Sequence, residues 1–251
     1  MSTIGPSFAA RWWGAVRIKP MSPQAPRVIR YEFTRPGGAS VAFTVTLDPK
    51  TLLNLTAAPA VAPEWAKLSF QKCPNCPLED TGVSACPGAL SLADVVNGFA
   101  DVFSFDRVAV RVTTPERTYE RLDMSVQSAL SPLLGLLMVT SGCPILAKLR
   151  PQTRFHLPFA TELETITRAT SLYLLAQYFV AEKGGTPDWE LEGLAQVYRA
   201  TEVVNRAFAN RLRAAAPKDA NVNALIRLNT FAHAMPETIE NHMQELRFLF
   251  E

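Results

Sequence analysis

Several features that usually assign a function to a sequence are missing from this chain of 251 residues. It has no G-x-G-x-x-G dinucleotide loop, no Walker A lysine loop, no G-x-S-x-G serine elbow and no H-E-x-x-H zinc motif. Histidine is scarce as well, with only His156, His233 and His242. These absences exclude the common enzyme signatures, so the function has to be sought in other residues.

Long hydrophobic runs are also missing. The two most apolar stretches, residues 132–139 and 172–181, are far shorter than the roughly 20 residues that cross a bilayer. The N-terminus lacks the basic start and the following apolar stretch of roughly 7–15 residues that an export signal needs. We therefore expect a cytoplasmic protein that has no membrane span.

The chain has no large excess of charge of either sign. Its 25 Lys and Arg side chains nearly balance 23 Asp and Glu side chains, and the net charge of +2 argues against a nucleic-acid binder. The balance is uneven along the chain, because residues 1–31 contain no acidic side chain but five basic ones (Arg11, Arg17, Lys19, Arg27 and Arg30). With Trp12 and Trp13, this segment either docks on a protein partner or lies over its own domain. We favour the second interpretation, since aromatic residues near a terminus usually serve packing.

The hydrophobic content of 48% is enough for a large core, and the hydrophobic pattern changes near residue 125. Before that point, β-branched and aromatic runs at residues 28–33 and 41–47 flank a Pro-Gly-Gly turn and predict an antiparallel hairpin. Further strands are expected at residues 65–71, 107–112 and 118–122.

The second half of the chain contains helix signals instead. Ser131-Pro132 is typical of an N-cap followed by proline at the first helical position, and Thr161 and Glu164 predict a capping box. Asp188 is expected to cap the next helix, and Pro236 to interrupt the last long one. The predicted class is α+β, with a basic arm (1–26), then a β-rich part (27–124) and a helical part (125–251) that form one integrated domain.

Four cysteines form the most specific chemical pattern. Cys73 and Cys76 make a C-x-x-C pair, and Cys86 and Cys143 can complete the four soft ligands that zinc or an iron–sulfur cluster prefers. They are too few for a disulfide scaffold at this length. Each precedes a proline, so Cys86 and Cys143 can be helix N-caps, where the helix dipole favours a thiolate. The alternative is four unrelated thiols, with Cys143 buried as a small hydrophobic residue.

These cysteines predict a metal-binding protein whose site, structural or regulatory, joins the β-rich part to the helical half. Zinc is the expected metal, and an iron–sulfur cluster is the alternative. His156 is a candidate for a substitute ligand or for a hydrogen-bond partner of a ligand, although it is more often a residue of a packed loop. Two other functions stay open: a thiol-based redox sensor, and a metal- or thiol-dependent enzyme that uses Cys143 or His156. No residue is assigned a catalytic role.

Several short motifs resemble those of one protein family. They are CPNCPL at residues 73–78, TSGCP at 140–144, RFHLPFATELET at 154–165, ATSLYLLAQYF at 169–179, VNRAFANRLRAA at 204–215 and DANVNAL at 219–225. Through them the chain is similar, from Tyr31 to the C-terminus, to a family of bacterial cytoplasmic proteins of unknown function. The resemblance implies a bacterial source and a single architecture, and it implies no activity, cofactor or catalytic residue.

Overall fold

Four strands form one antiparallel sheet in the computed structural model, which describes residues 25–57, 59, 61–79, 81–241 and 243–251. The strand order is β2-β1-β3-β4, with bounds β1 (Arg27–Thr34), β2 (Ser40–Leu47), β3 (Arg107–Thr113) and β4 (Thr118–Ser125). The predicted hairpin is confirmed, because β1 pairs with β2 along its whole length. Successive side chains of a strand point to opposite faces, and in β1 Tyr31 and Phe33 are fully buried whereas Arg30 is exposed.

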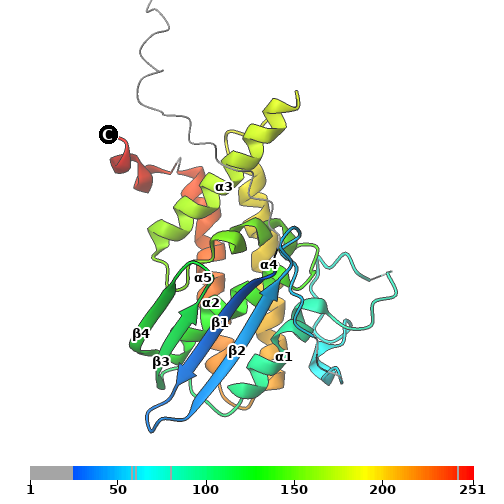
Figure 1. Ribbon diagram of the computed structural model, residues 1–251. Helices are drawn as coiled ribbons and strands as arrows, with labels where there is room; N and C mark the ends of the chain where they lie inside the picture. The colour runs from blue at the N-terminus through cyan, green and yellow to red at the C-terminus, as the bar shows by residue number, and fades with distance from the viewer. Residues whose placement is uncertain (1–24, 58, 60, 80, 242) are drawn as a thin grey trace, which may run out of the picture.

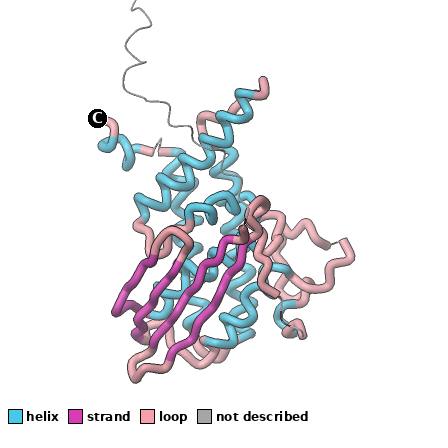
Figure 2. The backbone as a smooth tube through the Cα atoms, viewed as in Figure 1, coloured by secondary structure: helices cyan, strands magenta, loops and turns pink. Residues whose placement is uncertain are grey.

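Helices cover only one face of this sheet (Figures 1 and 2). α1 (Pro87–Gly98) and α2 (Val126–Thr140) lie against the strands, and α4 (Glu192–Ala215) and α5 (Ala220–Glu240) form the layer behind them. The segregation of a sheet and a helical layer confirms the α+β class. No helix of the described ranges is both long and apolar enough to cross a membrane.

The buried side chains of the described residues form two clusters. The larger lies between sheet and helices, where the rings of Phe33 and Phe99 pack edge to face with centroids 5.2 Å apart. The smaller joins α3 (Glu162–Glu182) to α4, to α5 and to the 3-10 helix η2 (Leu146–Phe155). Val139 of α2 packs against both clusters, so they are continuous.

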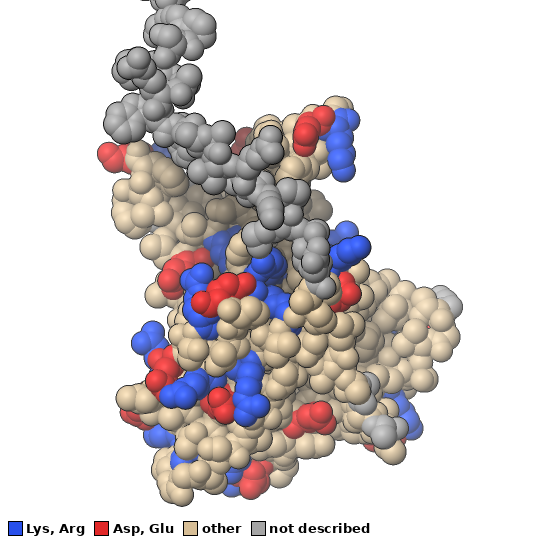
Figure 3. Space-filling model, viewed as in Figure 1, with Lys and Arg blue, Asp and Glu red and all other residues tan. Residues whose placement is uncertain are grey.

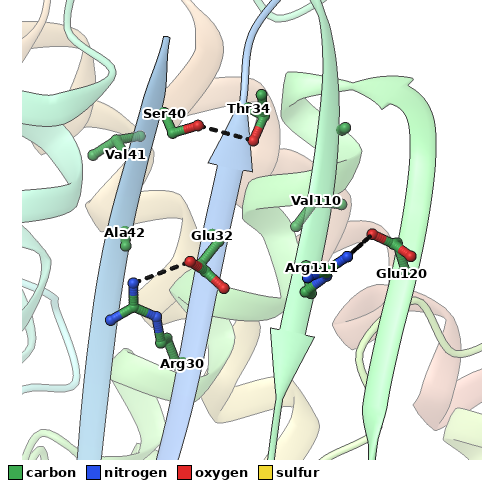
Figure 4. A pocket seen from close by; sticks show the side chains of 10 residues that line it. Arg30, Glu32, Thr34, Ser40, Val41, Ala42, Val110, Arg111 and Glu120 are labelled. Carbon is green, nitrogen blue, oxygen red and sulfur yellow. Dashed lines mark hydrogen bonds and ion pairs between the residues drawn. The ribbon is translucent and has the colours of Figure 1, made fainter. Parts of the chain in front are cut away.

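The uncovered face of the sheet is polar, and acidic and basic side chains are intermixed over it (Figure 3). Arg30 pairs with Glu32 at 3.0 Å and Arg111 with Glu120 at 2.8 Å, beside a hollow of about 420 Å³ (Figure 4). Arg27 at the end of β1 pairs with Glu116. Two of the five basic side chains of residues 1–31 are therefore engaged within the fold. The other three lie in residues 1–24, outside the described residues, as does most of the predicted arm.

Three predictions about single elements are wrong. Residues 65–71 do not form a strand, because the 3-10 helix η1 (Glu64–Ala66) is followed by turns. α2 begins at Val126, so Pro132 lies inside that helix, and Pro236 lies inside α5. Proline removes one helical hydrogen bond, a loss that packing on both sides can offset, and buried residues flank both prolines.

The helix termini include signals that were interpreted correctly. The predicted capping box is confirmed: Thr161 Oγ1 accepts a hydrogen bond from the Glu164 backbone N–H at 3.2 Å. The Glu164 carboxylate accepts one from the Thr161 N–H at 2.7 Å. The N-cap of α4 is Leu191 rather than the predicted Asp188, although the Asp188 carboxylate accepts a hydrogen bond from the Gly193 N–H in the first turn at 2.8 Å. The last described element is the 3-10 helix η3 (Gln244–Leu249).

Candidate functional site

The four cysteines belong to the larger hydrophobic cluster or pack against it. Cys73 and Cys86 are buried, Cys76 and Cys143 are partly buried and pack against the cluster, and all four are free thiols. Burial, together with the nearby Cys86, raises the pKa of Cys73 to about 12. Cys86 is the N-cap of α1 with Pro87 at the first helical position, as predicted. The environment of Cys73 nevertheless favours a neutral thiol.

The predicted metal-binding function is wrong, and with it the zinc or iron–sulfur site. Within the described ranges, no group of three or more His, Cys, Asp or Glu side chains is arranged to hold a metal ion. The four cysteines therefore do not form the joint between the sheet and the helices that the spacing suggested.

Arg211 makes the connection that had been assigned to a metal. Its guanidinium is fully buried and donates three hydrogen bonds to the segment before the cysteines, to the carbonyl oxygens of Trp65 (2.7 Å), Lys67 (2.8 Å) and Leu68 (3.1 Å). Further along, Asn75 Nδ2 donates to the Ala200 carbonyl oxygen at 3.0 Å. The cysteine-containing segment is thus attached to α4 by hydrogen bonds.

His156 is partly buried and forms a hydrogen bond with Tyr31 of β1. The distance from Tyr31 Oη to His156 Nε2 is 2.6 Å, and burial raises the pKa of Tyr31 well above its usual range, so the phenol stays protonated. Burial, together with the positive charges of Arg168 and Arg27, lowers the pKa of His156 to about 3. The imidazole is therefore neutral at physiological pH. The structure shows His156 bonded to a tyrosine and gives it no ligand role.

A cavity of about 600 Å³ lies beside this histidine, between β4, α2, η2, α3, α4 and α5. Its walls combine apolar side chains, among them Leu149, Leu228 and Phe231, with polar ones (Gln152, His156, Thr165, Arg168, Tyr198 and Asn205). Ligand pockets in proteins have volumes of roughly 300–1,000 Å³ and are lined by apolar side chains together with polar groups that orient the ligand. This cavity, rather than the cysteines, is the candidate functional site.

Two of its polar residues are held in place by neighbours. Tyr198 is almost fully buried, its ring packs edge to face on Phe231 at 5.5 Å, and its hydroxyl accepts a hydrogen bond from Gln152 Nε2 at 3.2 Å. Burial raises the pKa of Tyr198 to about 12. Arg168 Nη1 donates to the Phe155 carbonyl oxygen at 3.3 Å. The sequence offered little sign of either residue, because a lone arginine or tyrosine on an amphipathic helix looks like an ordinary surface or core residue.

Comparison with known proteins gives the chain a family and no activity. No curated protein and no solved structure matches it. A family described as a domain of unknown function, DUF6901, matches residues 29–251, which include every residue named in the cavity wall. The membership agrees with the resemblance to an uncharacterised family, and it leaves residues 1–28 outside the shared domain. The chain belongs to the DUF6901 family.

Proposed function

We propose that this protein binds a small molecule with an apolar body in the cavity between α2, η2, α3, α4 and α5. The observation that carries the proposal is a hollow of about 600 Å³ that is partly open to solvent and lined by side chains of several elements. A concave site of this size, lined by apolar groups together with polar ones, is typical of ligand pockets in proteins. The apolar side chains of its walls favour a ligand with a hydrophobic body.

The groups around the cavity support binding rather than catalysis. No cysteine is among the described residues that line it. His156 is held neutral with Nε2 occupied by Tyr31, so it is a weak base. Tyr198 and Gln152 are fixed by their mutual hydrogen bond and are suited to orienting a ligand.

A fluorescence titration tests this proposal. The neutral probe N-phenyl-1-naphthylamine, which brightens in apolar surroundings, should bind the full chain saturably with a stoichiometry of about one, as one cavity requires. Ala234 lines the cavity, and Ala234→Trp should fill it and abolish the signal. Ala214, exposed on α4, provides the matched control, and Ala214→Trp should bind like the parent chain. Equal binding by both variants, or no saturable binding by the parent chain, would refute the proposal.

A further inference from the structure

The charges around the cavity indicate which class of molecule it takes, an inference that rests on the proposed binding function. The described residues of the wall include three arginines, Arg121, Arg168 and Arg227, and one acidic residue, Glu162. Arg121 and Arg227 are exposed, whereas Arg168 is partly buried. An excess of guanidinium groups around an apolar space attracts a ligand that carries negative charge.

Arg168 has hydrogen-bonding capacity that the described residues leave unused. Nη1 donates to Phe155, while Nε is buried without a partner, and no carboxylate in the described ranges forms an ion pair with this guanidinium. Glu164, whose charge acts on Arg168, is engaged in the capping box with Thr161. A partly buried guanidinium that is not hydrogen-bonded to a carboxylate is costly, and an anionic ligand would supply such a partner.

Tyr198 provides a second unused donor beside this arginine. Its hydroxyl oxygen accepts from Gln152, but its own hydrogen has no acceptor among the described residues. Tyr198 and Arg168 both line the same cavity. The phenol stays protonated at physiological pH and can donate to an anion next to the guanidinium.

We propose that the ligand is a carboxylic acid with an apolar chain or ring, whose carboxylate is bound by Arg168 and Tyr198. The Nε–Nη2 edge of a guanidinium matches the two oxygens of a carboxylate and can donate two parallel hydrogen bonds. Tyr198 donates a third bond. The apolar body of the ligand lies against Leu149, Leu228 and Phe231.

Displacement of the naphthylamine probe by decanoate and by 1-decanol tests the charge preference, because the two competitors differ only in the head group. Decanoate should displace the probe at concentrations about tenfold lower than decanol, since a charge-assisted bidentate pair contributes at least this factor. If the probe does not bind, the proposed function fails. If the probe binds and both competitors displace it equally, the cavity binds small molecules but the carboxylate inference is overturned.

Substitutions of Arg168 and Tyr198 test whether these two residues cause the preference for decanoate over decanol. Arg168→Gln should remove the preference for decanoate while the affinities for the probe and for decanol stay within about twofold. Tyr198→Phe keeps the buried ring and removes the donor. It should therefore lower the affinity for decanoate by about threefold to tenfold and leave the affinities for decanol and the probe unchanged. Arg213→Gln, at an exposed position on α4, is the control and should change nothing. A decanoate preference that survives both Arg168→Gln and Tyr198→Phe would overturn the assignment, and circular dichroism verifies that each variant is folded.

Discussion

Arg211 is the residue on which the attachment of the cysteine segment depends most. Arg211→Met keeps much of the side-chain volume but removes the donor of the Trp65 and Leu68 carbonyl oxygens, whereas the Lys67 oxygen still accepts from the Phe70 N–H. Because buried acceptors without partners cost about 1–3 kcal/mol each, we expect the free energy of unfolding to fall by about 2 kcal/mol or more. Urea denaturation followed by circular dichroism measures this loss.

The control for that substitution lies two residues away. Arg213 is exposed and bonds only Asn210 Oδ1, at 2.7 Å, among the described side chains. Arg213→Met should therefore change the free energy of unfolding by less than about 0.5 kcal/mol. Similar losses for both variants would mean that Arg211 does not hold the segment.

The lowered pKa of His156 predicts a specific pH dependence of stability. The folded chain keeps the imidazole neutral down to pH about 3, whereas the unfolded chain protonates it below its ordinary pKa of 6.5. The unfolded state therefore binds more protons between these values, and stability that is complete above pH 6.5 is lost as the pH falls towards 3. The size of this loss is about 3 kcal/mol, because each pKa unit corresponds to about 1.4 kcal/mol and partial exposure reduces the effect.

Comparison of two histidine variants isolates this contribution. His156→Gln retains an acceptor for Tyr31 but cannot be protonated, so its stability should fall less steeply between pH 6.5 and pH 3. His233 is exposed, and His233→Gln should follow the parent curve. Glu116 contributes equally in all three proteins: hydrogen bonding to Arg27 lowers its pKa to about 2, so its contribution is lost only as the pH falls below 4.5. Parallel curves for His156→Gln and the parent chain would contradict the prediction.

At the scale of elements, the sequence predicted structure well where local chemistry decides it. The capping box at Thr161 depends only on residues three apart, and the β1–β2 hairpin depends on a short turn between two alternating runs. The predictions that a helix begins at Pro132 and that Pro236 interrupts another were wrong. Long-range packing, which one sequence does not reveal, keeps both helices continuous. The candidate site was missed for the same reason: Arg168, Tyr198 and His156 are far apart in the chain, and only the packing of three elements brings them to one cavity.

At the scale of the whole molecule, the two hydrophobic clusters should unfold together. α4 and α5 each contribute side chains to both clusters, and Val139 packs against both, so neither can lose its packing without exposing the other. The prediction that residues 27–124 and 125–251 form one integrated domain implies a single cooperative transition.

One substitution in each cluster tests this cooperativity. Leu133 is fully buried in the larger cluster and Met235 in the smaller one, and both have an exposed fraction of 0%. Leu133→Ala and Met235→Ala should each lower the free energy of unfolding by about 2–5 kcal/mol, through lost burial and the cavity left behind. In calorimetry, each variant should show one transition at a lower temperature, with calorimetric and van't Hoff enthalpies that agree. Two separate transitions, with Met235→Ala shifting only one of them, would show instead that α3 and the ends of α4 and α5 unfold as an independent unit, and that the cavity lies between two units that can separate.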